Sequence, residues 1–340
     1  MQKVVKLTLL AAMLACSYAS AVPESQLSTQ YNNQITPFWQ NHVTEGQLKS
    51  KDGLTLAYAY TIPEHAKATI LLVQGRTEAY IKYPEVFYDL SQRGYAVFML
   101  DHRGQGLSDR LLDDPHKGHV EVFQQYADDQ LLFLADVVQK QQQGKLVILA
   151  HSMGGAIAVQ LLAQNPNLFS GAVLSSPMIA PNTEVLFSER DGCGLETALG
   201  WICSDCYAGF VSQPYVNQDF ADNILMTSQA RYQQFRQVFA QSPKAQLGGP
   251  TWQWVNQACE VSQRMPRFAS QIKVPVLMLQ AGNEKAVSNN AQQQFCHDLG
   301  PNCQDGQVHS FAGASHELLF ERDEYRDKVL QLIDQFIERR

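Results

Sequence analysis

The segment around Ser152 constrains the fold more than any other part of the 340-residue chain. Residues 146–150 form an apolar run typical of a buried strand, and an apolar helical pattern follows Gly154 and Gly155. A strand, a sharp turn and a helix in this order hold a serine hydroxyl above the end of a parallel sheet. Ser152 is therefore predicted to be a nucleophile, although Ala150 stands where this motif usually has its first glycine.

A serine hydroxyl needs a base within hydrogen-bond reach and a third group that orients the base. Glu284 follows an apolar run and is the only carboxylate between Val274 and His297, and His316 follows another short run over residues 308–312. The order Ser, acid, His agrees with the order used by one class of serine hydrolases. We predict that Glu284 orients His316 and that His316 takes the serine proton.

The negative charge that develops on an attacked carbonyl oxygen requires backbone donors. We predict that the N–H of Met153, directly after the nucleophile, and the N–H of Arg76, after Gln74 and Gly75, form this oxyanion hole. Asp101 precedes the nucleophile in a turn-rich segment, so a structural role is expected for it.

Short apolar runs alternate with helical patterns along the chain, which predicts an α/β fold with a mostly parallel sheet and helices on both faces. A hairpin over residues 47–60 precedes them, with its turn at Asp52–Gly53. The predicted strands are 70–73, 96–100, 146–150, 172–175 and 274–279, and the predicted helices are 84–92, 122–139 and 155–164.

The alternation stops after residue 175 and resumes at residue 274, which indicates a long insertion rich in aromatic residues. We therefore divide the chain into a signal peptide (1–21), a core (22–177 and 268–340) and a lid insertion (178–267). The aromatic side chains of the insertion either form its own small core or cover an apolar ligand.

The N-terminus has the pattern of a secretory signal, with two lysines, an apolar run over residues 7–15 and small residues at 19–21. The apolar run is too short to span a bilayer. Cleavage would start the mature chain near Val22 and place it in the periplasm or outside the cell. Lipid attachment at Cys16 is the alternative.

Export makes disulfides the expected state of the six later cysteines. Cys296 and Cys303 flank a Gly300–Pro301 turn and are predicted to pair, and the other four would pair within the insertion. Cys203 and Cys206 could also suggest a redox or zinc pair, but no second pair of ligands follows nearby, so no metal is predicted. The four remaining cysteines are Cys193, Cys203, Cys206 and Cys259.

The chain has 26 basic and 33 acidic residues and a net charge of −7, which argues against nucleic acid as a partner. The segment 104–106 lacks the third glycine of a dinucleotide loop, so no nucleotide is implied. Basic residues nevertheless gather in two segments after predicted strands, where a phosphate headgroup could bind. Arg103 could instead hold loops together. The tentative substrate-binding residues are Arg76, Lys82, Arg110 and His116, and His102, Arg103, Lys117 and His119 lie in the same segments.

Taken together, these segments resemble the bacterial lysophospholipases of the L2 type, in the monoacylglycerol-lipase-like, serine aminopeptidase S33-like branch of the α/β-hydrolases. The resemblance runs from about residue 38 to the end and implies an α/β-hydrolase fold and an ester hydrolase without a cofactor. It also implies lysophospholipid or monoacylglycerol substrates, and peripheral contact with a membrane surface is a further expectation. The matching segments are 75–83, 101–106, 110–120, 149–155, 248–251 and 313–321.

Three functions compete at this point. The first is a lysophospholipase, and the second is a monoacylglycerol lipase or a general carboxylesterase with the same fold. The third is a non-catalytic scaffold that binds a ligand or a partner. The complete set of Ser152, Glu284 and His316 argues against the scaffold.

Overall fold

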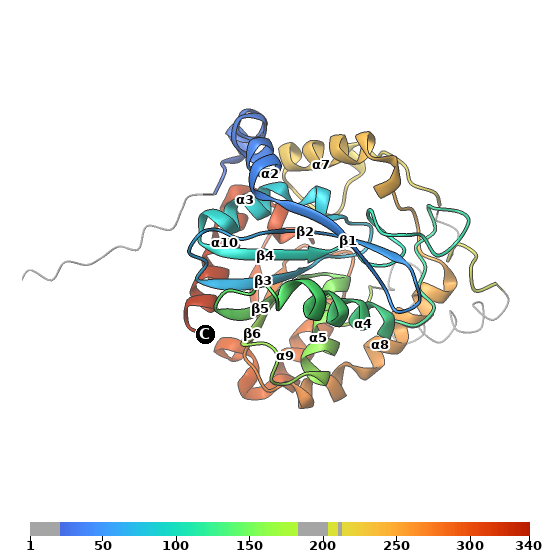
Figure 1. Cartoon of the computed structure of the whole chain (residues 1–340). Helices are drawn as coiled ribbons and strands as arrows, with labels where there is room; N and C mark the ends of the chain where they lie inside the picture. The colour runs from blue at the N-terminus through green and yellow to red at the C-terminus, as the bar shows by residue number, and fades with distance from the viewer. Residues whose placement is uncertain (1–20, 183–202, 210–212) are drawn as a thin grey trace, which may run out of the picture.

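The computed structural model describes residues 21–182, 203–209 and 213–340, and it is built around one eight-stranded sheet (Figure 1). The strand order is β1-β2-β4-β3-β5-β6-β7-β8, in which β2 is antiparallel to both of its neighbours, β1 and β4, and all other neighbouring pairs are parallel. The strands are β1 (Thr44–Lys49), β2 (Thr55–Thr61), β3 (Ala68–Val73), β4 (Tyr95–Leu100), β5 (Lys145–His151), β6 (Gly171–Ser175), β7 (Val276–Ala281) and β8 (His309–Phe311).

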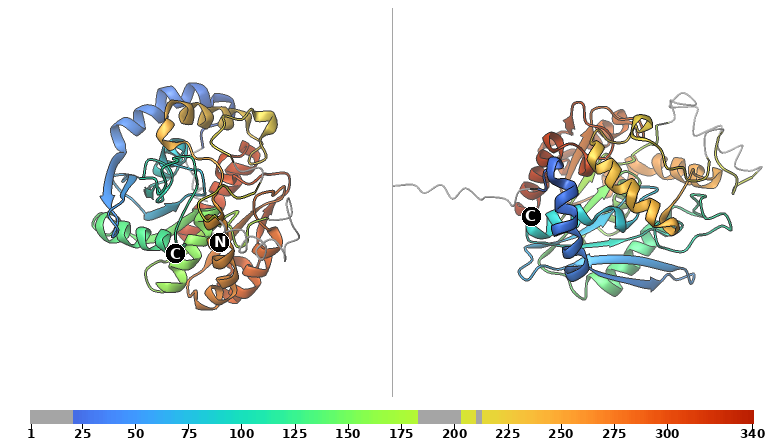
Figure 2. Two further views of the ribbon diagram at one scale, coloured as in Figure 1. Left: turned by 90° about the vertical axis from the view of Figure 1, so that its right-hand side faces the viewer. Right: turned by 90° about the horizontal axis from the view of Figure 1, so that it is seen from above.

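Helices cover both faces of the sheet, as predicted (Figures 1 and 2). On one face α2 (Thr36–His42), α3 (Pro84–Gln92) and α10 (Asp323–Glu338) share a core with the sheet. On the other face lie α4 (Gln124–Phe133), α5 (Met153–Gln164), α8 (Trp252–Gln271) and α9 (Asn289–Leu299). Within residues 21–182, 203–209 and 213–340, the remaining helices are α1 (Leu27–Gln30) and α7 (Gln229–Gln241). The 3-10 and π turns are η1 (Glu24–Gln26), η2 (Tyr31–Ile35), η3 (Tyr80–Lys82), η4 (Leu134–Val138), η5 (Phe220–Asp222), η6 (Pro243–Ala245), η7 (Gly300–Asn302), η8 (Gln304–Gly306) and η9 (Leu318–Phe320).

Apolar side chains that alternate between the two faces of the buried strands contribute to the core on each side of the sheet. Ile70 and Leu72 of β3 face the α3 side, while Leu71 and Val73 face the α5 side, because successive side chains of a strand point to opposite faces. The predicted helix over 122–139 is α4 followed by the π turn η4. No helix among the described residues has the length and hydropathy needed to cross a bilayer.

The turn from β5 to α5 depends on close backbone packing. Ser152 has φ 52° and ψ −121°, a conformation that is rare for a residue with a side chain. A Cβ on Gly154 would lie 2.1 Å from the carbonyl oxygen of Val73, and one on Gly155 would lie 2.4 Å from Cβ of Pro177. Only glycine fits at either position, so the helix can start directly against β3 and the loop after β6.

The insertion between β6 and β7 ends in a helix that belongs to the main core. The boundary predicted between residues 267 and 268 falls inside α8, whose buried Met265 and Phe268 lie in the same core cluster as α5. A continuous amphipathic helix packed on the sheet side cannot be divided at that point. We call residues 213–251 the cap segment; it contains α7, which Figure 2 shows beside the N-terminal helices.

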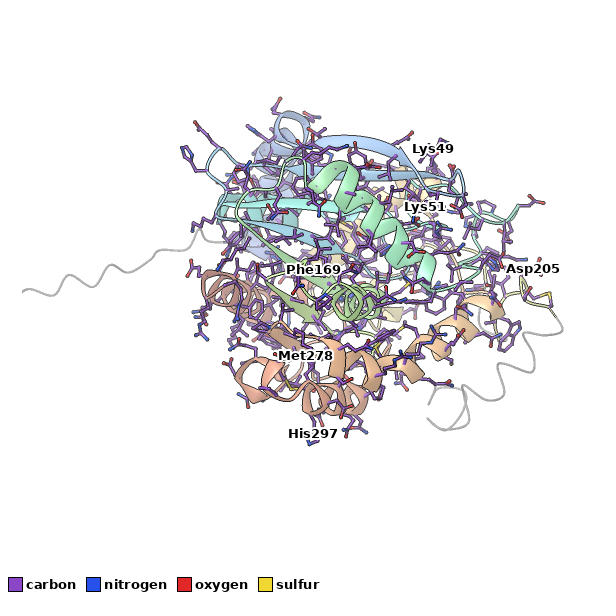
Figure 3. The ribbon with its side chains drawn as sticks, turned by 60° about the horizontal axis from the view of Figure 1, so that its bottom comes forward. Lys49, Lys51, Phe169, Asp205, Met278 and His297 are labelled. Carbon is purple, nitrogen blue, oxygen red and sulfur yellow. A yellow bond between two sulfur atoms is a disulfide. The ribbon has the colours of Figure 1, made fainter. Side chains whose placement is uncertain are left out.

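The one specific pairing that was predicted, Cys296 with Cys303, falls within the described residues. Cys296 and Cys303 lie at disulfide distance with their Cα atoms 5.3 Å apart, and Cys203 and Cys206 also lie at disulfide distance, with their Cα atoms 5.4 Å apart. Figure 3 shows Asp205 beside this second pair at one end of the molecule. Cys259 is buried in α8, and Cys193 lies outside the described residues.

Candidate active site

The carboxyl ends of three parallel strands bring Ser152, Glu284 and His316 together. Ser152 follows β5, Glu284 follows β7 and His316 follows β8. Nε2 of His316 lies 2.8 Å from the Ser152 hydroxyl oxygen, and Nδ1 of His316 lies 2.8 Å from Oε2 of Glu284. The imidazole therefore connects the acid to the nucleophile with hydrogen-bond distances on both sides.

Glu284 is held as a charged group. Burial raises the pKa of Glu284. The hydrogen bond from His316 and the backbone donors lower this pKa by more than burial raises it, so the pKa lies below its ordinary value. The N–H groups of Lys285 (2.9 Å) and Ala286 (2.7 Å) donate to Oε1 and leave Oε2 for the histidine. An acceptor-only carboxylate fixes the proton of His316 on Nδ1, and its Nε2 is then free to accept the serine proton.

His151 lies beside the catalytic imidazole without adding charge to it. The two rings are 4.8 Å apart between centroids. Burial lowers the pKa of His151 to about 4, so the ring is neutral at pH 7, and its Nδ1 donates to the carbonyl oxygen of Ser175 (3.2 Å). A neutral neighbour does not oppose the positive charge that His316 gains when it takes a proton.

The predicted oxyanion donors lie on either side of the nucleophile. Met153 is the first residue of α5, where the N–H has no partner within the helix. Arg76 follows Gly75, and a Cβ on Gly75 would lie 3.1 Å from Cβ of Ser152. The loop after β3 therefore approaches the nucleophile closely, which the oxyanion role of the Arg76 N–H requires.

A buried carboxylate holds this loop in place. The N–H of Gly75 donates to Oε2 of Glu78 (2.6 Å), and the Tyr83 hydroxyl donates to the same oxygen (2.7 Å). Lys82 then pairs with Oε1 of Glu78 and with Oε2 of Glu317, each at 2.5 Å. Glu317 directly follows His316, so these contacts connect the oxyanion loop to the histidine loop.

The three groups of this network are buried, and the ammonium and each carboxylate change the pKa of one another. Glu78, Lys82 and Glu317 are each no more than 6% exposed. Burial raises the pKa of Glu78, but Lys82 lowers it to about 2, and burial raises the pKa of Glu317. Burial lowers the pKa of Lys82, but the two carboxylates raise it above its ordinary value, so the ammonium stays charged.

The sequence predicts Lys82 as a substrate-binding residue and does not point to Glu78 or Glu317 as part of the site. The available signal was the four-residue spacing of Glu78 and Lys82 next to the oxyanion loop, together with an acid directly after the histidine. In the structure the Lys82 ammonium is occupied by two carboxylates and lies over the rings of Phe235 (4.9 Å) and Phe320 (4.5 Å).

The other predicted cations have different surroundings. The Arg110 guanidinium donates to four backbone carbonyl oxygens. Burial lowers the pKa of His102 to about 4, so it is no cation at pH 7. Arg103 pairs with Asp129 and Asp52, which is the loop-holding role considered for it.

A cavity of about 330 Å³ is lined by Arg76 and by Glu317, the residue after His316, but by none of the three triad residues. It is lined by residues adjacent to the catalytic loops and by the cap segment. Arg76 and Lys82 belong to this lining, whereas Arg110 and His116 do not. The lining residues are Arg76, Thr77, Glu78, Lys82, Gln213, Pro214, Tyr215, Val216, Gln218, Leu225, Phe235, Arg236, Phe239, Leu247, Gly248, Gly249, Pro250 and Glu317.

Comparison with known proteins identifies the family of the chain. Residues 64–323 match the serine aminopeptidase S33 family. The chain belongs to this family. Lysophospholipase L2 of Escherichia coli K12 is 33% identical over 313 residues, which cover 90% of each chain. Mouse monoglyceride lipase is 25% identical over 294 residues, which cover 86% of this chain and 90% of the relative.

Solved structures confirm the α/β-hydrolase fold. A monoglyceride lipase from Saccharomyces cerevisiae superimposes with a TM-score of 0.69 at 17% identity and covers 88% of this chain and 96% of its own. A monoacylglycerol lipase from Paleococcus ferrophilus gives a TM-score of 0.62 at 18% identity, with 87% and 98% coverage. The fold and the family predicted from the sequence are both confirmed.

The arrangement suits acyl transfer through a covalent intermediate. His316 accepts the Ser152 proton as the hydroxyl oxygen attacks an ester carbonyl, and the N–H groups of Met153 and Arg76 can stabilise the resulting oxyanion. The protonated His316 then donates to the leaving alcohol, and a water molecule activated by the same ring releases the acid.

The first prediction concerns the triad. Ser152→Ala or His316→Ala is expected to lower kcat by about six orders of magnitude, and Glu284→Gln by rather less, because the three groups act as one unit. The measurement is hydrolysis of a chromogenic short-chain ester, with fluorophosphonate labelling to report the nucleophile. Retention of more than about a tenth of the activity by Ser152→Ala would rule out this nucleophile.

The second prediction concerns Lys82. Lys82→Met leaves two buried carboxylates without their cation, so the hold of Glu78 on Gly75 weakens and the oxyanion donor shifts. We expect kcat to fall about 10- to 100-fold for every ester, charged or uncharged. The exposed Lys140→Met is the control and should retain full activity. A loss confined to lysophospholipids would show instead that Lys82 binds the headgroup.

Proposed function

We propose that this protein is a serine ester hydrolase that removes the acyl chain from lysophospholipids. The observation that carries the proposal is the hydrogen-bonded chain from Glu284 through His316 to Ser152 in a protein 33% identical to lysophospholipase L2 over 90% of both chains. The products would be a fatty acid and a glycerophospho-alcohol. Each turnover consumes one water molecule.

The cavity offers two cations to a phosphate. Arg76 donates to the carbonyl oxygen of Gly248 (2.9 Å), and Arg236 of α7 donates to Asn217 Oδ1 (2.7 Å) and lies over the Tyr215 ring (5.0 Å). Both line the cavity, and among the described residues neither forms an ion pair with a carboxylate. A phosphate in the cavity would gain charge-assisted hydrogen bonds from a guanidinium group.

A monoacylglycerol substrate is the second candidate. Lys82 contributes no free charge to the cavity, and the carboxylates Glu78 and Glu317 also line it. An uncharged glycerol headgroup would avoid repulsion by these acids and could bond to hydroxyl and backbone groups. Relatives include monoglyceride lipases as well as lysophospholipases.

The third prediction separates these substrates. The parent protein should have a higher kcat/KM for a lysophospholipid than for a monoacylglycerol of the same acyl length. Arg236→Gln should reduce kcat/KM about tenfold for the lysophospholipid and leave the monoacylglycerol nearly unchanged, since one hydrogen bond to a charged group is lost. Arg264→Gln, at an exposed position on α8, is the matched control.

Equal effects of Arg236→Gln on both lipids, or a parent preference for monoacylglycerol, would contradict the headgroup proposal. The monoacylglycerol lipase function would then take its place.

The protein is further proposed to be exported and to act at a lipid surface. Val216 and Ile224 of the cap segment are 50% and 58% exposed, and Val216 lines the cavity. Apolar side chains beside a substrate cavity can enter the boundary of a membrane. Sedimentation with anionic phospholipid vesicles tests this contact, and an unchanged bound fraction in Val216→Ser with Ile224→Ser would contradict it.

The fourth prediction concerns the cysteines. In an oxidising compartment we expect Cys296 to be bonded to Cys303, because their Cα atoms are 5.3 Å apart across a short turn. Cell fractionation followed by peptide mapping without reductant measures location and pairing together. Recovery of the protein in the cytoplasm with alkylatable thiols at both positions would contradict export and pairing.

A further inference from the structure

Three helices converge on a buried cluster of charges away from the triad. Arg231 of α7 pairs with Glu85 of α3 (3.0 Å) and with Asp323 of α10 (2.9 Å). Arg326 of α10 pairs with Asp89 of α3 (2.7 Å) and with Glu85 (3.3 Å). Both arginines are no more than 2% exposed, so the cap helix α7 is connected to the core through buried ion pairs.

The cluster has more acids than bases. Its two guanidinium groups face three carboxylates, of which Asp323 is partly exposed. The charged groups beside the cluster do not change this excess, because Asp327 is a further acid and Arg93 is paired with Asp334. One more positive charge would therefore be favourable at this position.

The first described residues of the chain enter this cluster. The Val22 nitrogen lies 3.4 Å from Oδ1 of Asp89, and the Val22 carbonyl oxygen accepts a hydrogen bond from Arg231 (3.0 Å). The N–H of Glu24 donates to Oδ2 of Asp323 (2.8 Å). The Val22 side chain is 4% exposed.

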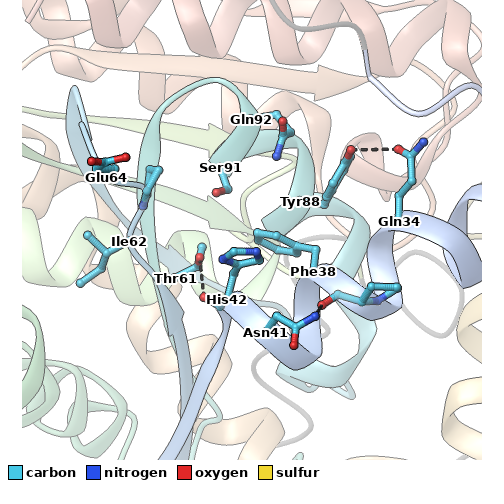
Figure 4. Close-up of a pocket in the computed structure, with 12 residues that line it drawn as sticks. Gln34, Phe38, Asn41, His42, Thr61, Ile62, Glu64, Tyr88, Ser91 and Gln92 are labelled. Atoms are coloured by element: carbon cyan, nitrogen blue, oxygen red, sulfur yellow. Dashed lines mark hydrogen bonds between the residues drawn. The ribbon is translucent and has the colours of Figure 1, made fainter.

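The segment that follows is fixed to the same helices. Val22 shares an apolar cluster with Leu27 and Ile35, and Ala230 of α7 packs against that cluster. Residues 34–42, at the end of this segment, line a cavity of about 560 Å³ together with part of α3. Figure 4 shows Phe38 beside Tyr88 of α3 in this cavity. The Tyr88 hydroxyl donates to Gln34 (2.9 Å).

We propose that cleavage between Ala21 and Val22 creates an α-ammonium group that forms a buried ion pair with Asp89 and supplies the missing positive charge. An endopeptidase would break the peptide bond with one water molecule, which leaves a carboxylate on Ala21 and an amine on Val22. The amine takes up a proton at neutral pH. A neutral amide donor is thereby replaced by a cation in a site with excess negative charge.

The new ion pair would act on the substrate cavity through α7. Arg231 lies in the first turns of α7, and Phe235 and Arg236 on the same helix line the cavity. Removal of the signal peptide would then strengthen the contacts of α7 with α3 and α10 as the mature protein forms. This inference depends on the proposed export of the chain and is independent of which ester is hydrolysed.

The experiment compares two versions of the protein released from a cleavable fusion. One begins at Val22 with a free amine, and the other begins at Ser20, so that Val22 remains in an amide bond. We expect the Val22 form to have a Tm higher by at least about 3 °C, because a charged hydrogen bond replaces a neutral one. In Asp89→Asn this difference should vanish, whereas the exposed Asp136→Asn should preserve it.

Equal Tm values for the two forms, or a difference that persists in Asp89→Asn, would overturn the proposal. If Asp89→Asn fails to fold, the unmutated Val22 form still provides a test. Its α-amine should react with an acetylating reagent at least about tenfold more slowly in the folded protein than in urea. Equal rates, or an exported protein that does not begin at Val22, would also overturn it. Neither Tm nor labelling depends on esterase activity.

Discussion

The close contact between the start of α5 and strand β3 is the constraint on which the active site depends. Because Gly154 lies against the Val73 carbonyl, the chain must turn at Ser152 with a positive φ, and the serine side chain then points out of the sheet. This turn places the hydroxyl oxygen 2.8 Å from Nε2 of His316, a residue that lies 164 positions later in the sequence. A side chain at Gly154 would push the helix from the sheet, and the backbone donor of Met153 would move with it.

Buried ion pairs connect the loops around the nucleophile in addition to apolar packing, such as the contact of Tyr83 with Phe320. The oxyanion loop and the histidine loop leave different strands, and Lys82 joins them through Glu78 and Glu317. A second set of buried ion pairs joins the cap helix to α3 and α10 through Arg231. Removing one partner from such a buried network leaves an unpaired charge, which costs several kcal/mol, so each network favours a single arrangement of its loops. Precise positions of the reacting groups follow from that specificity.

The sequence predicts the central features because they depend on local pattern. The apolar run before Ser152, the two glycines after it and the isolated Glu284 can all be recognised without coordinates. The role of Lys82 is only partly visible in the sequence: the four-residue spacing to Glu78 is a local signal, but the sequence does not reveal that the distant Glu317 reaches the same ammonium group. The predicted end of the insertion falls inside α8, because the aromatic start of this helix gives no sign that the helix packs on α5.

The central claim is that Ser152 carries the acyl group of the substrate during turnover. Acid quenching of the enzyme within the first turnovers on a lysophospholipid, followed by mass spectrometry of its peptides, tests this claim most directly. The account predicts an acyl ester on the peptide that contains Ser152, with the released alcohol formed in a burst of about one equivalent. An acyl group on another residue, or one full turnover without any covalent adduct, would contradict it.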